Sequence, residues 1–537
     1  GLTTFGPGGD FDALPKESSQ GLRVILRNQN ETKEETVRAI GEFNGWNAIA
    51  ALATCRFAFQ KEVRGRLSSF PGLLRRQVVL KETAQRIIME DYAHHPVELT
   101  VMLRRFRDRW SDREIKVVFQ PHRFSRQASL QNAFAEALSS ADQVHLLPTY
   151  GAGEELIKEG SAEVLRELLP VTIRDSKVQN SFSELCEAIG SDSSRPDCVL
   201  FLGAGDIELH ASAFSHLEDV QWNRWLACEN YLRERLSTAA EFRLNESLSD
   251  KTTLRVGGQA KIYCEPAGAD DLRELIIAGR MFSMPLFALG RGSNLIVPTE
   301  GYDGIVLSMR ASAWRGIEVA PKGRLVVGAG TRLKEICLFA CNQSLAGFEF
   351  LEGIPGTLGG ALRMNAGAMG ASMFDLVEKI TLMTAKGIRR EMYRDEFDAR
   401  YRECPELENS FVINATLMAA AKATKVHIEN RLRSFAETRM ASQPRGATAG
   451  CIFRNPRGDS AGRLIDQTGL KGARVGAAEV SLTHGNFIVN RGGAKTEDVL
   501  SLIRMVRHRV KEARGIELEP EVTLMGKSWK ETFKTNL

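Results

Sequence analysis

The sequence has few of the features that mark exported, membrane or nucleic-acid-binding proteins. Nowhere in its 537 residues does an apolar run approach the length of about 18 residues that a membrane-spanning helix needs. The opening residues also lack the apolar segment of a signal peptide. The formal net charge is only +4 and the basic residues are spread along the chain, which argues against a nucleic-acid-binding surface. We therefore expect a cytoplasmic protein that neither enters a membrane nor binds a nucleic acid.

Disulfide and metal-binding patterns are missing as well. The nine cysteines are odd in number and include no CxxC pair. This distribution argues against a disulfide framework and against a zinc ribbon. The adjacent His94 and His95 would point in different directions on any regular element, so we interpret them as packing or capping residues. A reducing compartment and no bound metal are expected.

The length of the chain and the changes in its composition indicate several domains. The usual domain size predicts about three or four domains for a chain of 537 residues. Before residue 240, short apolar runs such as EIKVVFQPH and PDCVLFLGAGD alternate with helical stretches, and a helix is expected at 37–57. Alternating strands and helices predict a parallel α/β sheet. After residue 240 the texture changes to glycine-rich loops and short strands, which places a domain boundary there.

Two glycine-rich loops dominate the second part of the chain. In the first, LFALGRGSNLIV, Gly290 to Asn294 lie between two apolar runs, and the second extends from Gly353 to Gly370. Glycine lets backbone N–H groups approach an anion closely, so such loops are typical of diphosphate sites, although either alone is compatible with a tight turn. The ATP-binding pattern GxxxxGK[ST] occurs nowhere in the sequence. A nucleotide cofactor other than ATP is expected.

Eight motifs give the second part a family resemblance. In chain order they are TTLRVGG, GRGSNLIV, GIPGTLGGALRMNAGA, ARYREC, GCIFRNP, LIDQTGLKG, HGNFIVN and LEPEV. Over residues 242–526 the chain resembles the UDP-N-acetylenolpyruvoylglucosamine reductases. The resemblance implies NADPH-dependent, FAD-mediated reduction of UDP-N-acetylglucosamine enolpyruvate to UDP-N-acetylmuramate in peptidoglycan synthesis. It also implies a two-part α+β FAD-binding domain at 241–428 and a smaller α+β substrate-binding domain, with the C-terminal catalytic strand, at 429–537.

The same resemblance assigns residues to the cofactor and to the substrate. The residues implied to hold FAD are Arg255, Gly290, Arg291, Gly292, Ser293, Asn294, Gly353, Ile354, Pro355, Gly356, Gly359, Gly360, Asn365, Ala366 and Gly367. The residues implied to bind the UDP-sugar are Tyr401, Arg439, Gln443, Asn455, Gln467, Lys471, His484 and Asn486. An anionic UDP-sugar needs donors of this kind. Taken singly, each would pass for an ordinary surface residue, so the assignment depends on the surrounding motifs.

Three residues are implied to be catalytic. Arg402 and Glu521 match the family residues that polarise the substrate carboxylate, where a cation lowers the cost of developing negative charge. Cys451 takes the place of the proton donor, which is serine in many relatives. A thiol, with an ordinary pKa of about 8.5, releases a proton more readily than a hydroxyl. Outside these motifs, Cys451 would be interpreted as a buried apolar residue and the other two as a solvated ion pair.

The first part of the chain resembles the later half of the UDP-N-acetylmuramate:L-alanine ligases over residues 42–207. The motifs that carry this resemblance are FNGWNAIAAL, FPGLLRRQVV, MEDYAHHPVEL, VVFQPHRFSR, PTYGAGEE and FLGAGDIE. The last of these begins like a dinucleotide fingerprint but has Glu208 at the place of the third glycine. The implied parts are a remnant of the ligase central domain at 1–80, the ligase C-terminal α/β domain at 81–225 and a linker helix at 226–240.

Three functions remain open at this point. A ligase of this family positions ATP with a glycine-rich loop that carries a lysine, and the 537 residues contain no such loop. The sequence also begins at Gly1 rather than at methionine, which leaves two expectations open: the N-terminal half of the ligase is missing, or the module persists as a degenerate docking partner. The alternatives are a reductase, a ligase that becomes bifunctional when its missing half is present, and an inactive ligase-like scaffold that binds UDP-muramyl compounds.

Overall fold

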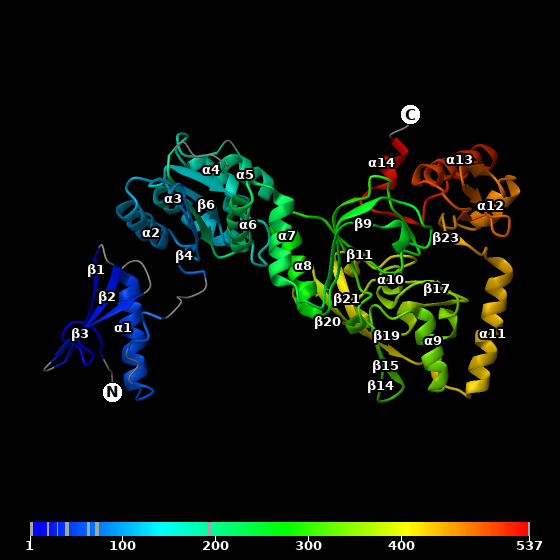
Figure 1. Cartoon of the computed structure of the whole chain (residues 1–537), viewed down its shortest axis with the longest axis horizontal. Coiled ribbons are helices and arrows are strands. Elements are labelled where there is room, and N and C mark those ends of the chain that lie inside the picture. Colours follow the sequence, from blue (N-terminus) through cyan, green and yellow to red (C-terminus); the bar gives the residue numbers. More distant parts are fainter. Residues whose placement is uncertain are drawn as a thin grey trace. The chain divides into compact units, whose positions relative to one another are not determined.

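The computed structural model describes residues 4–18, 21–28, 31–37, 42–61, 65–69, 75–175, 177–190 and 195–534 (Figure 1). The chain divides into two compact units. The first unit comprises Gly1–Glu229 and Met281–Ser283, and the second comprises Asn230–Arg280 and Met284–Leu537. None of the helices in the described ranges combines the length and the apolar character needed to cross a membrane.

The first unit contains a five-stranded sheet with helices on both faces (Figure 1). The strand order is β4 (Val78–Glu82), β5 (Arg86–Asp91), β8 (Asp197–Gly203), β6 (Glu114–Gln120) and β7 (Gln143–Leu146). All but β4 run parallel, which confirms the predicted parallel α/β sheet. Every residue of β8 is buried, as expected for a strand covered on both sides. The covering helices are α2 (Pro96–Arg109), α3 (Phe124–Leu138), α4 (Ala162–Leu168), α5 (Phe182–Ile189) and α6 (Ile207–Asp219).

A small antiparallel sheet precedes this layer. It consists of β1 (Ala13–Ser18), β2 (Gly21–Asn28) and β3 (Glu31–Val37), and it packs against α1 (Glu42–Phe57). The helix expected at 37–57 is present from Glu42 to Phe57, but the expectation is wrong at Val37, which ends β3 and supplies a buried side chain to the small sheet. Residues 38–41, and the first five residues of the FPGLLRRQVV motif, 70–74, lie outside the described part of the chain.

The second unit begins in α7 (Arg224–Arg235), where a linker helix is predicted, and continues into two sheets. The first has the order β11 (Leu286–Leu289), β13 (Tyr302–Ser308), β10 (Gln259–Glu265) and β9 (Glu241–Ser247), and α8 (Ala269–Met281) connects β10 to β11. The second is antiparallel, with the order β14 (Ile317–Ala320), β15 (Arg324–Gly328), β21 (Ser410–Met418), β19 (Val377–Thr384) and β20 (Arg389–Tyr393). Its core includes α9 (Leu333–Asn342) and α10 (Leu358–Arg363).

A third sheet follows the long helix α11 (Lys425–Ser442). Its order is β23 (Ala447–Cys451), β26 (Phe487–Asn490), β25 (Ala478–Val480) and β24 (Arg474–Val475), and it shares a core with α12 (Ala461–Gln467) and α13 (Thr496–Arg514). We use the name substrate domain below for residues 429–537, the range that the family resemblance predicts for it. The short parallel pair of β12 (Leu295–Ile296) and β27 (Thr523–Leu524) brings the C-terminal segment beside the first glycine-rich loop. The combination of one parallel α/β sheet with α+β parts confirms the predicted fold class.

Candidate active site

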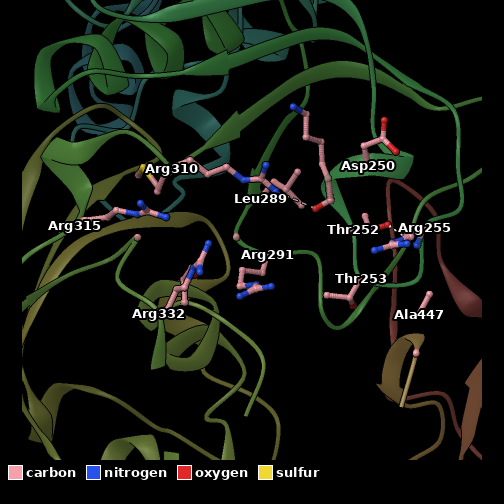
Figure 2. A pocket seen from close by; sticks show the side chains of 16 residues that line it. Asp250, Thr252, Thr253, Arg255, Leu289, Arg291, Arg310, Arg315, Arg332 and Ala447 are labelled. Atoms are coloured by element: carbon pink, nitrogen blue, oxygen red, sulfur yellow. Dashed lines mark hydrogen bonds between the residues drawn. The ribbon is translucent and has the colours of Figure 1, made fainter. Parts of the chain in front are cut away.

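A cavity of about 660 Å³ opens beside the first glycine-rich loop. Five arginines line it, contributed by separate loops: Arg255, Arg291, Arg310, Arg315 and Arg332. Figure 2 shows the guanidinium groups of the last four around one space, with Arg255 entering from the side of Thr252 and Ala447. The other lining residues are Asp250, Lys251, Thr252, Thr253, Leu289, Gly290, Met309, Gly330, Thr357, Gly446 and Ala447.

The charges in this cavity are poorly compensated. Burial, together with the nearby Arg332 and Arg310, lowers the pKa of the Arg291 guanidinium. Among the described residues, the only carboxylate within 4 Å of any of the five arginines is that of Glu335, which lies 3.8 Å from Arg332. Four of the five arginines are exposed and only Arg310 is half-buried, so their charges are accessible from the cavity. Such a cluster of cations favours a ligand with more than one negative charge, such as a diphosphate.

Three of the predicted cofactor residues line the cavity, namely Arg255, Gly290 and Arg291. No sequence pattern points to Arg310, Arg315 or Arg332, because each is a single arginine in a loop or at a helix start and only the fold brings them together. Thr252 and Thr253 lie inside the TTLRVGG motif but were not singled out by it.

The first glycine-rich loop connects the cavity to the rest of the site. Gly292 has a φ of +62°, and a Cβ atom there would lie 2.8 Å from the Cα of Thr252, so only glycine fits. The Ser293 hydroxyl donates to the carbonyl oxygen of Pro355 (2.6 Å) and thereby ties this loop to the second one. The Asn294 side chain donates to the carbonyl oxygen of Glu521 (3.4 Å). The loop is therefore joined to a predicted catalytic residue.

The second glycine-rich loop contacts the substrate domain at its start. Gly353 has a φ of +72°, and a Cβ atom there would lie 2.6 Å from Cδ of Arg439. Arg439 in turn donates to the carbonyl oxygen of Gly353 (3.3 Å). The loop then passes through Ile354, Pro355 and Gly356 into α10, which contains Gly359 and Gly360.

Asn365, farther along the same loop, holds the segment that precedes Arg402. Its side chain donates to the carbonyl oxygen of Arg400 (3.1 Å) and accepts a hydrogen bond from the backbone N–H of Phe374 (3.2 Å). Ala366 and Gly367 follow it into the short strand β17 (Gly367–Ala368). The amide of Asn365 is thus engaged with protein backbone on both sides.

Arg402 and Glu521 form a close ion pair although 119 residues separate them. Nε of Arg402 lies 2.7 Å from one carboxylate oxygen of Glu521, and the Tyr401 hydroxyl donates to the other (3.3 Å). The Glu521 side chain is only 9% exposed. Its backbone N–H donates to the carbonyl oxygen of Ile452 (2.7 Å), so the carboxylate is fixed beside the strand that carries Cys451.

Cys451 ends β23, just after a register irregularity between Thr448 and Cys451. Burial raises the pKa of its thiol to about 11, and the nearby Glu521 carboxylate raises it further against the opposing effects of Arg402 and Arg439. The thiol is therefore protonated at neutral pH. Cys451, Arg402, Glu521 and Arg439 lie close enough to influence one another electrostatically, so the structure brings the three predicted catalytic residues together.

Asn486 supports this strand from within the substrate domain. It is 3% exposed, donates to the carbonyl oxygen of Phe453 (2.8 Å) and accepts from the N–H of the same residue (2.9 Å). Asn455 accepts from the N–H of Ala461 (3.0 Å) at the start of α12. Both amides thus fix the backbone that follows Cys451.

The remaining predicted substrate residues fall into two places. Gln467 ends α12, Lys471 follows it, and His484 lies beside Gly462 in the first turn of the helix. Burial and the nearby Lys471 lower the pKa of the His484 imidazole. Lys471 also pairs with Asp466 at 2.7 Å. Gln443 ends α11, four residues after Arg439.

Comparison with known proteins gives matches on both units. Three family models match: "UDP-N-acetylenolpyruvoylglucosamine reductase, C-terminal domain" over residues 443–525, "FAD binding domain" over 260–392, and "Mur ligase, glutamate ligase domain" over 75–205. The UDP-N-acetylenolpyruvoylglucosamine reductase of Geotalea uraniireducens (strain Rf4) is 39% identical over 297 residues, which are 55% of this chain and 98% of the relative.

Solved structures include relatives of the same two kinds. The UDP-N-acetylenolpyruvylglucosamine reductase from Thermus caldophilus is 37% identical, with 53% of this chain and 98% of that chain covered and a TM-score of 0.46. The UDP-N-acetylmuramate-alanine ligase from Thermotoga maritima is 25% identical, with 41% of this chain covered and a TM-score of 0.32. This chain spans about half the length of that ligase, 48%.

Proposed function

The chain belongs to the UDP-N-acetylenolpyruvoylglucosamine reductase family, and we propose on that basis that it uses NADPH to reduce UDP-N-acetylglucosamine enolpyruvate to UDP-N-acetylmuramate in peptidoglycan synthesis. The observation that carries the proposal is the cluster of Cys451, Arg402 and Glu521. These side chains come from three distant segments, and together they offer a proton donor, a cation and a buried carboxylate.

The arginine-lined cavity fits the diphosphate of FAD. Arg255 and Arg291, with Arg310, Arg315 and Arg332, would neutralise the two phosphates, and Gly290 lets the backbone approach them. The match of residues 260–392 to an FAD-binding domain supports this assignment. The chemistry that FAD would supply when bound is hydride transfer, from NADPH to the terminal vinyl carbon of the substrate.

The chain's own residues would handle charge and the proton. Arg402, held by Glu521 at 2.7 Å, would stabilise the negative charge that develops on the substrate carboxylate as the double bond is reduced. Cys451, whose thiol keeps its proton at neutral pH, would transfer that proton from Sγ to the carbon that bears the carboxylate. Arg439 lies near both and would add a second cation for the anionic substrate.

The half-reactions of the purified protein test the proposal. We expect a yellow protein whose flavin absorbance is bleached by NADPH without oxygen and restored rapidly by the enolpyruvyl UDP-sugar. A colourless protein that takes up no FAD would contradict the reductase assignment. Failure of the sugar to restore the absorbance would contradict the assigned substrate.

A ligase-related role for the first unit is the second candidate, favoured by the match of residues 75–205 to a Mur ligase domain. Joining L-alanine to UDP-N-acetylmuramate requires ATP, and the sequence has no ATP loop of the expected type. Within this chain the unit would therefore act as a scaffold for UDP-muramyl compounds, and as a ligase only together with the ATP-binding half of such an enzyme.

A cytoplasmic location is part of the proposal. All nine cysteines are free, and six of them are buried. A protein whose thiols include a required proton donor needs a reducing compartment, because oxidation of Cys451 would remove its proton.

A further inference from the structure

The loop 252–256 belongs to two parts of the second unit at once. Leu254 and Val256 are 0% and 2% exposed and lie in the apolar core of the substrate domain. Arg255, between them, lines the FAD cavity instead (Figure 2). The substrate domain therefore controls where the backbone of a cavity arginine lies.

Arg255 also has an unfavourable backbone conformation. Its φ is +59°, in the left-handed region that favours glycine. A residue other than glycine keeps such a conformation only when surrounding contacts hold it. Some group must therefore fix the carbonyls on either side of this position.

Asn490 supplies those contacts from the end of β26. Its side-chain NH₂ donates to the carbonyl oxygens of Leu254 (3.0 Å) and Arg255 (3.3 Å). Its side-chain oxygen accepts from the N–H groups of Gly492 (2.9 Å) and Ala494 (3.1 Å). Both ends of the amide are engaged, so the side chain is held in one orientation.

We propose that Asn490 is a positioning residue for FAD, which sets the affinity for the cofactor by holding Arg255 in the cavity. The inference rests on the proposed function in taking FAD as the ligand. Two further contacts agree with it. Thr253 donates to the carbonyl oxygens of Thr448 (2.7 Å) and Gly292 (3.3 Å), and Gly446 and Ala447 of the substrate domain line the cavity themselves. The substrate domain thus completes the cofactor site rather than merely adjoining it.

A double-mutant cycle with Asn490→Ala and Arg255→Ala tests the proposal. The measured quantity is the dissociation constant of FAD, from the fluorescence of flavin released when the yellow holoprotein is diluted. Asn490→Ala should raise this constant about tenfold, the effect of one or two ordinary hydrogen bonds. In the Arg255→Ala background the same change should have an effect of no more than about twofold, because the group it positions is already absent.

Two more variants distinguish positioning of Arg255 from a general loss of stability of the substrate domain. Asn490→Asp keeps the acceptor for Gly492 and Ala494 but cannot donate to the 254 and 255 carbonyls, so it should weaken FAD binding as much as Asn490→Ala. Thr496→Val removes a similar buried bond, from the Thr496 hydroxyl to the carbonyl oxygen of Val297 (2.7 Å), at a residue that does not line the cavity. It should leave the dissociation constant unchanged.

Each other outcome has a definite meaning. Equal effects of Asn490→Ala in both backgrounds, or equal weakening by Thr496→Val, would overturn the positioning role. So would an Asn490→Asp variant that binds FAD like the parent. A parent protein that binds no FAD would instead refute the proposed function, and the two failures are thereby distinguishable.

Discussion

At the scale of single residues, the proton transfer proposed for Cys451 can be measured separately from the hydride transfer to the flavin. We expect Cys451→Ala to leave bleaching of the flavin by NADPH near the parent rate, because that step needs no substrate acid. The step in which the enolpyruvyl sugar restores the flavin absorbance should slow by about two to four orders of magnitude, which is the usual contribution of a positioned general acid. Stopped-flow absorbance measures both steps.

The matched control is Cys451→Ser, which keeps a proton on the same atom position. It should retain substantial activity, whereas a purely structural cysteine would tolerate alanine at least as well as serine. If Cys451→Ala restores its flavin absorbance as fast as the parent, the proton comes from another group.

The raised pKa of Cys451 makes a prediction about pH. A thiol acts as an acid only while protonated, so the rate that depends on it falls as pH rises through its pKa. With a pKa of about 11, the substrate-dependent step should stay nearly constant between pH 8.5 and 9.5. An ordinary thiol with a pKa of about 8.5 would make the rate fall severalfold over that range. Cys451→Ser controls for other ionisations.

Sequence alone could name these residues only through resemblance. Arg402 and Glu521 are separated by 119 residues, and nothing in their local patterns indicates that they pair. The cavity arginines were harder still. Arg310 follows a strand, Arg315 follows a single turn of 3-10 helix at 312–314, and Arg332 precedes a helix. Single arginines are common at such positions, so the convergence of these three depends on the tertiary fold.

At the scale of elements, the first glycine-rich loop offers a prediction with a matched control. Gly292→Ala should destabilise the protein and also weaken FAD binding at least about tenfold, because its Cβ would displace Thr252 in the cavity wall. Gly515→Ala, at the end of α13, has a similar φ of +68° but no atom within 4 Å of the added Cβ. It should lose about 1–2 kcal/mol of stability and retain the parent affinity for FAD.

Thermal unfolding and the dissociation constant of FAD together check this pair. Equal weakening of FAD binding by both substitutions would show that backbone strain anywhere in the second unit suffices. The close approach of Gly292 to Thr252 would then not be the cause of the weaker FAD binding.

Strands with apolar runs could be predicted from the sequence, whereas a strand made mostly of charged and polar residues could not. Strands β5, β6 and β8 are buried on both faces, so their sequences contain short apolar runs, IIM, VVF and CVLFL, that predict a parallel sheet. Strand β3, ETKEETV, is almost entirely polar and gives no strand signal. It pairs with β2 all the same, since Leu22, Val24 and Val37 supply the buried side chains of that small sheet.

At the scale of the whole molecule, we expect the reductase activity to depend on the second unit alone and no ligase activity from the intact protein. All cavity and catalytic residues lie in the second unit, so a fragment of residues 222–537, which keeps α7 whole, should bind FAD and reduce the enolpyruvyl sugar. The intact protein should release no phosphate from ATP in the presence of L-alanine and UDP-N-acetylmuramate, because it lacks an ATP loop. A coupled phosphate assay measures the latter.

Two results would contradict this assignment of activities to the two units. One is a colourless fragment, which would make the first unit necessary for cofactor retention. The other is substrate-dependent phosphate release by the pure intact protein, which would mean that ATP binds through residues with no recognisable loop pattern.

The half-buried Cys451 also gives the protein a reactive group that a serine at this position would not supply. With a pKa of about 11, about one thiol in 3,000 is ionised at pH 7.5, so iodoacetamide should alkylate it slowly. A weakly reactive electrophile that carries its own carboxylate would be drawn to the neighbouring Arg402 and Arg439, which favour the thiolate. Such a reagent should inactivate this protein selectively and irreversibly while sparing reductases that place a hydroxyl at the same position.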